Sequence, residues 1–140
     1  MNRSLGIDLG DARIGLAISD ELGMLAHPLE TIHTKEEPDP AGRIAHIVAR
    51  DKIGIIILGL PRNMNGTYGP AAEKSRAFAE LLRTKVPCEV KLWDERLTSV
   101  AAQKSLHAGG KNAKQSRAVI DQVAAQLILQ GYLDSQAMFG

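Results

Sequence analysis

The sequence predicts an α/β fold built on a mixed β-sheet, and two observations carry that prediction. The first is the stretch Ser4–Ser19, which reads as an apolar strand, a glycine and aspartate turn, and a returning strand. This order is typical of an antiparallel hairpin. The second is a strand, helix and strand succession that ends in the apolar run Ile53–Leu60, because such a crossover joins parallel strands. We therefore expect a sheet that begins antiparallel and continues parallel, with helices on both faces.

Length, charge and cysteine content narrow the class of protein. With 140 residues, we expect one domain over residues 1–140. Seventeen basic and sixteen acidic residues leave a net charge of +1, so nucleic acid would have to be bound by a local basic patch. Cys88 is the only cysteine, which excludes an internal disulfide framework and argues against a zinc cluster. The sequence shows no signal segment and no membrane-spanning run, so we expect a cytoplasmic protein without a membrane partner.

An edge strand and a capped helix are expected after the hairpin. Met24–His33 reads as extended and contains Pro28, which cannot donate to a sheet ladder and therefore predicts an edge position. Asp39 suits a helix N-cap with Pro40 at the first helical position, and this helix should end near Asp51. The apolar residues at helical spacing are Ile44, Ile47 and Val48.

The middle of the chain reads as a buried strand, a loop, a helix and another strand. Ile53–Leu60 is almost continuously apolar, as expected of a central strand covered on both faces. Pro61–Pro70 predicts a loop at the carboxyl end of that strand, where ligands collect in open α/β sheets. A helix over about Ala71–Lys85 and a strand over Glu89–Trp93 follow. The residues expected on the buried face of that helix are Phe78, Leu81 and Leu82.

Two helices are expected in the last part of the chain. Thr98 or Ser99 can cap a short helix, and His107–Lys114 reads as a basic loop. A long helix is expected over about Gln115–Leu133. Its apolar stripe would be Val119, Ile120, Val123, Leu127 and Ile128.

Three acidic positions stand out because each lies on a different element. Asp8 lies at the end of the first strand, and Asp121 lies among the apolar residues of the long helix. Glu95 follows the last strand, with Asp94 beside it. Carboxylates that converge without basic partners repel one another, and Mg²⁺ ions shared between them relieve this repulsion. Two such ions about 4 Å apart can activate a water molecule for phosphodiester hydrolysis. Each acid also has an ordinary interpretation: Asp121, for example, follows Arg117 at the spacing of a helical ion pair.

Basic residues on turns and helix starts predict phosphate contacts around one rim of the molecule. The candidate nucleic-acid-binding residues are Arg13, Arg62, Asn63, Lys104, Lys111, Lys114 and Arg117. The histidines show no metal-ligand spacing, and the serines lack a nucleophile elbow. Neither residue type therefore supports a competing catalytic site.

Four blocks of the sequence resemble the YqgF, or RuvX, family. They are GIDLGDARIGLA at 6–17, LGLPRNMNGTYGP at 58–70, WDERLTS at 93–99 and IDQVAAQLILQGYLD at 120–134. The blocks occur in the family's order and span essentially the whole chain, so together they are more specific than any one of them. The resemblance implies an RNase H-like fold, with a five-stranded mixed sheet whose antiparallel meander is followed by parallel strands.

The resemblance also implies a metal-dependent nuclease. Members are regarded as candidate Holliday junction resolvases and as nucleases that process the 5′ end of pre-16S rRNA. The family's acidic triad matches Asp8, Glu95 and Asp121, with water as the nucleophile and Mg²⁺ or Mn²⁺ as the cofactor. Junction resolvases of the RuvC type carry their second acid on the fourth strand, where this chain is apolar. Asp94 therefore stays an alternative to Glu95 as the second metal ligand.

Two other classes of function stay open. The pattern D-x-G-x-x-x-x-G-x-A from Asp8 to Ala17 resembles the first phosphate loop of actin-type and sugar-kinase ATPases. Those proteins need two such domains to clamp a nucleotide, and this chain has room for one. A non-catalytic RNA-binding module of ribosome assembly could use the same surface. We expect structured RNA, such as pre-16S rRNA, or branched DNA as the partner, and a monomer or weak homodimer.

Overall fold

The computed structural model describes residues 2–61, 65–94 and 113–139, with the side chains of the last helix described from 122 to 137. The strands are β1 (Arg3–Leu9), β2 (Arg13–Ser19), β3 (Ala26–His33), β4 (Ile53–Leu60) and β5 (Glu89–Asp94). The helices are α1 (Pro40–Arg50), α2 (Pro70–Lys85) and α4 (Ala113–Phe139). The short helix expected after Thr98 lies outside the described residues.

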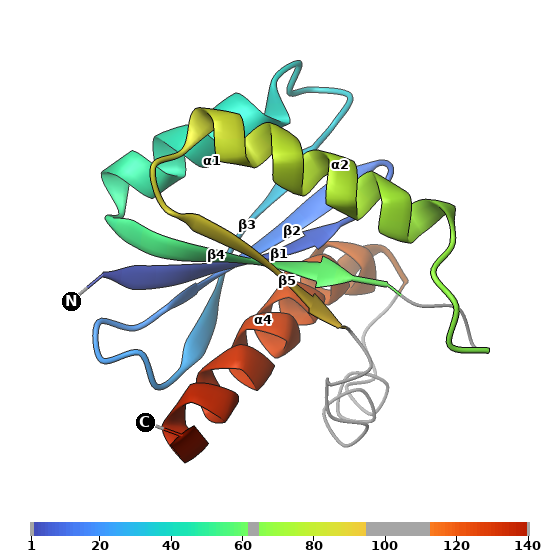
Figure 1. Cartoon of the computed structure of the whole chain (residues 1–140). Helices are drawn as coiled ribbons and strands as arrows, with labels where there is room; N and C mark the ends of the chain where they lie inside the picture. The colour runs from blue at the N-terminus through green and yellow to red at the C-terminus, as the bar shows by residue number, and fades with distance from the viewer. Residues whose placement is uncertain (1, 62–64, 95–112, 140) are drawn as a thin grey trace.

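A five-stranded mixed sheet in the order β3-β2-β1-β4-β5 forms the middle of the molecule (Figure 1). β1 pairs antiparallel with β2, and β2 pairs antiparallel with β3. β1, β4 and β5 are parallel to one another. The expected meander followed by parallel strands is therefore confirmed. Because the three parallel strands end at the same edge of the sheet, we call that edge the carboxyl edge.

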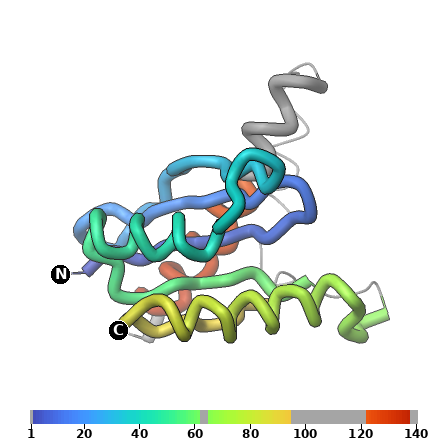
Figure 2. Tube along the Cα trace, turned by 90° about the horizontal axis from the view of Figure 1, so that it is seen from above, coloured from blue at the N-terminus to red at the C-terminus, as the bar shows by residue number. Residues whose placement is uncertain are grey.

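The helices cover both faces of this sheet, as expected. Figure 2, seen from above, shows α1 and α2 beside each other over the strands, with α4 beneath them. On the side of α1 and α2, which we call the α1/α2 face, Leu5 and Ile7 of β1 pack against Ile47 of α1 and Leu82 of α2. On the opposite side, the α4 face, residues of β2, β4 and α4 form a second, smaller cluster. Successive side chains of each strand therefore reach two separate cores.

β3 lies at the edge of the sheet, as Pro28 predicts. Pro28 pairs with Ala17 beside a register shift in β2, a position where a missing backbone donor is tolerated. Glutamines of α4 bind the backbone at the start of β3. Gln130 accepts a hydrogen bond from the N–H of Ala26 at 2.8 Å, and Gln126 donates to the carbonyl of Ala26 at 2.9 Å. These side chains satisfy backbone groups that an open edge would offer to another strand.

α1 begins where the sequence predicts. The carboxylate of Asp39 accepts a hydrogen bond from the N–H of Gly42 at 3.1 Å, and Pro40 occupies the first helical position. The helix ends at Arg50, with Asp51 as its C-cap. The expected apolar residues Ile44, Ile47 and Val48 are all buried. Local capping and helical periodicity are sufficient to place this element.

The buried face of α2 differs from the expected one. Leu82 is buried as expected, but Leu81 is 45% exposed and Phe78 is only half-buried. The residues that α2 buries are Ala72, Ser75, Ala79 and Leu82. Small side chains at three of these positions allow the helix to approach the sheet closely, so close packing rather than apolar bulk sets its rotation.

α4 is held against β1 by a close backbone contact at Gly6. A Cβ atom on Gly6 would lie 2.7 Å from the Cβ of Leu129 and 2.8 Å from the carbonyl oxygen of Ala125. Real Cβ atoms essentially never lie so close to other atoms, so only glycine fits this position without a shift of α4. This contact fixes both the height of α4 above the sheet and its rotation.

The apolar stripe of α4 is rotated from the expected one for this reason. Ile128 is buried, but the other described members of that stripe, Val123 and Leu127, are half-buried. The side chains of Val119 and Ile120 lie outside the described ones. The described residues that α4 buries are Ala125, Ile128, Leu129 and Leu133. Neither α4 nor any other helix among the described residues is long and apolar enough to cross a membrane.

Candidate active site at the carboxyl edge

Asp8 lies at the carboxyl edge, one residue before the end of the central strand β1, and its side chain is half-buried. Leu5, Ile7 and Leu9 belong to the core of the α1/α2 face. Because side chains alternate along a strand, Gly6 and Asp8 lie on the α4 face. The close contact of Gly6 with α4 agrees with this assignment.

Glycines flank Asp8 on both neighbouring strands. Asp8 pairs directly with Gly15 of β2. On the other side, Ile7 pairs with Leu58 of β4, so the next residue of β4, Gly59, lies beside Asp8. Because residues that face each other across strands share a face of the sheet, the carboxylate of Asp8 has no side chain beside it on either neighbouring strand.

α4 brings the backbone of Asp121 to the same edge. Gln122 donates a hydrogen bond to the hydroxyl of Thr31, near the end of β3, at 3.1 Å. Gln130, two turns later, bonds Ala26 at the start of β3. α4 therefore runs antiparallel to β1 and begins at the carboxyl edge. Asp121 precedes Ala125 by one helical turn, which places its backbone towards the Asp8 end of β1. The side chain of Asp121 lies outside the described ones.

Asp94 lies on the other face of the sheet from Asp8. It is the last residue of β5 and pairs with Leu60. Val90 and Leu92 of β5 pack in the core of the α1/α2 face, whereas Trp93 packs against the smaller cluster on the α4 face. Alternation therefore places Asp94 on the α1/α2 face. Glu95, its neighbour in sequence, lies outside the described residues.

Arg13 is the one expected phosphate contact whose side chain is described. It begins β2 at the carboxyl edge, and its carbonyl accepts a hydrogen bond from the N–H of Gly10 at 3.0 Å. Lys114 and Arg117 lie on the first turns of α4, which begins at Ala113, so Lys114 is helical rather than in the expected loop. The side chains of these two residues are not described. The remaining candidates, Arg62, Asn63, Lys104 and Lys111, lie outside the described residues.

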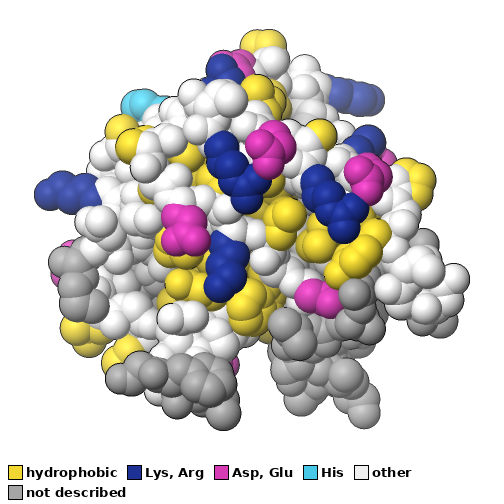
Figure 3. Space-filling view, viewed as in Figure 1, with side chains coloured by type: hydrophobic (Ala, Val, Ile, Leu, Met, Phe, Trp, Pro, Cys, Tyr) yellow, Lys and Arg dark blue, Asp and Glu magenta, His cyan; other side chains and the backbone are white. Residues whose placement is uncertain are grey.

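Two further cations at this edge were missed by the sequence analysis. Lys74 and Arg76 lie on the first turns of α2, which follows the carboxyl end of β4. Lys74 forms an ion pair with Asp11 of the β1–β2 turn. The Arg76 guanidinium lies 4.7 Å from the centre of the Tyr68 ring. Figure 3 shows that basic, acidic and hydrophobic side chains intermingle on the face it displays. Basic residues in the first two turns of a helix that follows a buried strand are the signal that could have identified this pair.

A half-buried aromatic pair lies on the α4 face near the end of β5. The rings of Trp93 and Tyr132 meet edge to face at 5.8 Å between centroids. Burial raises the pKa of the Tyr132 hydroxyl above its usual value. Among the described residues, no group of three histidine, cysteine, aspartate or glutamate side chains is arranged to hold a metal ion. Two members of the expected triad, Glu95 and Asp121, have no described side chain and are not among these residues.

Sequence comparison groups the chain with a family of nucleases. A family model for RuvX, described as a Holliday junction resolvase, matches residues 2–135. The chain is 45% identical over 138 residues to a protein of Halalkalibacterium halodurans named "Putative pre-16S rRNA nuclease", covering 97% of this chain and 99% of that one. A protein of the same name from Pelotomaculum thermopropionicum is 47% identical over 135 residues, covering 96% of this chain and 88% of that one.

Structural comparison finds the same fold in two resolvases. RuvC of Thermus thermophilus, solved in complex with a Holliday junction substrate, has a TM-score of 0.61 at 15% identity, covering 97% of each chain. The Holliday junction resolvase of fowlpox virus has a TM-score of 0.56 at 15% identity, covering 95% of this chain and 99% of that one. These likenesses confirm the expected RNase H-like fold.

Proposed function

The chain belongs to the RuvX family, and from that premise we propose that it is a metal-dependent endonuclease that hydrolyses phosphodiester bonds in structured nucleic acid. Family membership places the chain among nucleases. The observation that supports the mechanism is the position of Asp8 at the carboxyl edge of the central strand, between two glycines. We propose 5′-end maturation of pre-16S rRNA as its role in the cell.

The surroundings of Asp8 fit a divalent cation. Carboxylate oxygens are the ligands that Mg²⁺ and Mn²⁺ prefer, and Asp8 supplies a carboxylate at the carboxyl edge, where both neighbouring strands carry glycine beside it. Asp8, Glu95 and Asp121 would hold the metal, and the backbone of Asp121 lies at the required edge. When bound, such ions polarise the phosphoryl oxygen and lower the pKa of water.

The protein's own side chains would orient the nucleic acid. Asp8 would hold the metal, and with it the substrate phosphate, at the carboxyl edge, because its carboxylate projects from a rigid central strand. Arg13 would contact a neighbouring phosphate, because it begins β2 at the same edge. We extend phosphate contact to the other candidates of the rim, which are Arg62, Asn63, Lys104, Lys111, Lys114 and Arg117.

We assign Glu95 rather than Asp94 as the second acidic ligand. Asp94 lies on the α1/α2 face of the sheet, and Asp8 lies on the α4 face. A ligand on the opposite face would have to reach around the strand end to share an ion with Asp8. Glu95 is the adjacent carboxylate in the sequence, and it is the residue that matches the family's acidic triad.

Structured RNA is the proposed substrate because relatives 45% and 47% identical are named for pre-16S rRNA. Branched DNA is the competing substrate, because the family description and the RuvC likeness both refer to Holliday junctions. We propose that the protein acts in the cytoplasm, since rRNA is processed where ribosomes are assembled. We further propose that it is a monomer or weak homodimer.

Cleavage of two labelled substrates tests the proposed function. A 5′-extended fragment of rRNA precursor and a four-way DNA junction would each be incubated with Mg²⁺ or Mn²⁺ and wild type, Asp8→Asn or Asp134→Asn. Asp134 is an exposed carboxylate far along α4, so Asp134→Asn is the matched control. We expect the wild type and Asp134→Asn to cut the RNA, and Asp8→Asn to be inactive while keeping a native circular dichroism spectrum.

Three outcomes have distinct meanings. Cutting of the junction alone would transfer the substrate assignment to DNA. Undiminished cutting by folded Asp8→Asn would refute the role of Asp8. Binding of RNA without cleavage at any metal concentration would support the non-catalytic assembly module instead.

A further inference from the structure

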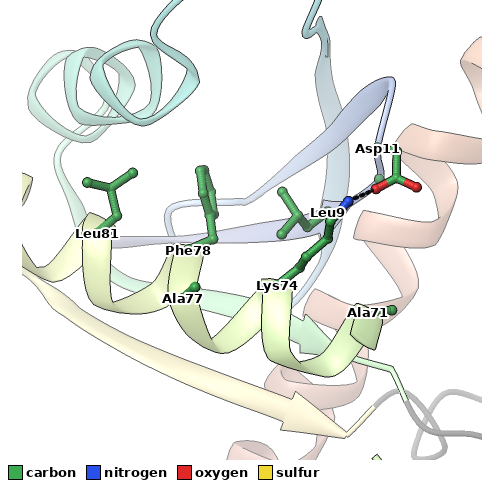
Figure 4. A pocket seen from close by; sticks show the side chains of 8 residues that line it. Leu9, Asp11, Ala71, Lys74, Ala77, Phe78 and Leu81 are labelled. Carbon is green, nitrogen blue, oxygen red and sulfur yellow. Dashed lines mark hydrogen bonds and ion pairs between the residues drawn. The ribbon is translucent and has the colours of Figure 1, made fainter. Parts of the chain in front are cut away.

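A cavity of about 460 Å³ lies at the carboxyl edge, on the side of the sheet opposite Asp8. Figure 4 shows the β1–β2 turn on one side of it and the first three turns of α2 on the other. Its lining residues are Leu9, Gly10, Asp11, Ala71, Lys74, Ala77, Phe78 and Leu81. We propose that this cavity binds one unpaired nucleobase of the substrate strand. The proposal rests on the proposed nuclease function and specifies its substrate.

The walls of the cavity suit the faces of a nucleobase. Phe78 and Leu81 stand on α2 along the cavity, and neither is fully covered by protein. Leu9 of β1 adds a further apolar side chain to the lining. Bases stack on aromatic side chains irrespective of sequence, because every base has a π-face. An aromatic ring in an apolar, open cavity is therefore a suitable stacking surface.

The polar end of the cavity suits the edge and backbone of a nucleotide. The ion pair of Lys74 and Asp11 lies there (Figure 4). The carboxylate of Asp11 can accept a hydrogen bond from an exocyclic amino group. The ammonium of Lys74 can contact a phosphate on the same strand. An apolar ligand such as a lipid chain would leave this charged pair without a role.

Hydrogen bonds within the protein hold the β1–β2 turn, which forms one wall of the cavity. Thr34 fixes the β1–β2 turn, since its hydroxyl donates to the carbonyls of Asp11 and Ala12 at 3.1 Å each. The backbone N–H of Thr34 also donates to the carbonyl of Ala12 at 3.0 Å. A preformed site avoids the cost of ordering a loop when the ligand binds.

The position of the cavity relates it to the proposed reaction. Leu9, which lines the cavity, follows Asp8 directly in β1, and the two side chains point to opposite faces. A strand that crosses the carboxyl edge with a phosphate at Asp8 would therefore bring a neighbouring base to the cavity. Because paired bases are held in a duplex, only an unpaired base can enter without disruption of pairing. The preferred substrate would thus carry single-stranded RNA next to the scissile bond, rather than a fully paired junction.

Filling the cavity tests this inference. Ala77 is exposed, lies on α2 and lines the cavity, so Ala77→Leu would occupy the space of the base without disturbing the core. Ala49 is an exposed alanine on α1 that does not line the cavity, so Ala49→Leu is the matched control. Binding of a short fluorescein-labelled single-stranded RNA would be measured by anisotropy in EDTA. We expect Ala77→Leu to weaken binding about tenfold, and Ala49→Leu to bind like the wild type.

Removal of single bases from the RNA identifies the partner. An abasic nucleotide at the position that enters the cavity should weaken binding by the wild type about tenfold and leave binding by Ala77→Leu unchanged. The same RNA in a duplex should bind equally to both proteins. Equal affinity of Ala77→Leu and wild type for single-stranded RNA would overturn the proposal. So would a loss of affinity for the duplex, caused by Ala77→Leu, as large as the loss for the single strand.

Since these measurements contain no metal and require no cleavage, they are independent of the proposed nuclease. The protein could cut nothing and yet show coupling, meaning that the effects of Ala77→Leu and of one abasic position on RNA affinity are not additive. That result would support the base pocket and refute the nuclease. Metal-dependent cleavage without such coupling would refute only the pocket.

Discussion

Gly6→Ala is the sharpest test of how the fold positions the candidate site. The added methyl group would lie 2.7 Å from the Cβ of Leu129 and 2.8 Å from the carbonyl oxygen of Ala125. An ordinary van der Waals contact begins near 3.4 Å, so α4 would have to move away from β1 by about 0.7 Å. The backbone oxygen cannot rotate aside as the end of a long side chain could.

The cost of this overpacking is about 1–3 kcal/mol. For a chain of this size that corresponds to a fall in Tm of roughly 3–12 °C. Movement of α4 would also displace Asp121 from Asp8, and small misplacements of catalytic groups cost up to about 100-fold in rate. We therefore expect cleavage by Gly6→Ala to fall at least about tenfold at a temperature where the variant is folded.

Gly23→Ala is the matched control for this experiment. Gly23 lies in the β2–β3 turn with φ 71°, and a Cβ there would meet nothing within 4 Å. The left-handed backbone costs an alanine about 1 kcal/mol, so stability should fall without loss of cleavage. Differential scanning calorimetry and the RNA cleavage assay would be applied to both variants. Unchanged Tm and cleavage in Gly6→Ala would refute the reasoning, and so would equal losses of activity in both variants.

Two further predictions concern stability. Gln130→Ala removes the hydrogen bonds to the N–H of Ala26 (2.8 Å) and to the carbonyl of Met24 (2.9 Å). Urea denaturation should therefore show that the free energy of unfolding falls by about 1–3 kcal/mol. An unchanged denaturation midpoint would mean that water replaces the glutamine at the β3 edge. Hydrogen bonding to Arg50 holds the pKa of Asp51 below its usual 3.8, so this carboxylate stabilises the fold above that pH and loses its effect as the pH falls through the lowered pKa. Asp51→Asn should therefore lower the Tm at pH 7, through a loss of less than about 1 kcal/mol in the free energy of unfolding. The difference in Tm from the wild type should vanish in strong acid. A difference that grows as the pH falls would contradict this reasoning.

Local sequence was sufficient for the order and type of the described elements. Asp39 and Pro40 start α1 because capping depends on adjacent residues alone. Pro28 places β3 at an edge because its missing N–H is a property of the residue itself. The candidate acid Asp8 could be chosen from the sequence for the same reason, since alternation along a strand separates it from its apolar neighbours.

Only the tertiary structure decided which residues meet. Leu81 was expected in the core and is exposed. A helix with apolar residues on several sides turns the side that packs most closely towards the sheet, and in α2 that side carries small residues. Asp94 and Glu95 are adjacent in sequence, and only the register of β5 with β4 places Asp94 on the face away from Asp8. Lys74 and Asp11 are distant in the chain and meet because α2 packs beside the β1–β2 turn.

The sequence by itself thus determined the strands, the helices and the acids they carry, because those follow from short-range periodicity and turn chemistry. The common edge of Asp8 and Asp121 was decided by tertiary packing, since it depends on α4 lying antiparallel to β1 over Gly6. That contact joins residues more than a hundred positions apart, and no local pattern encodes the distance between them.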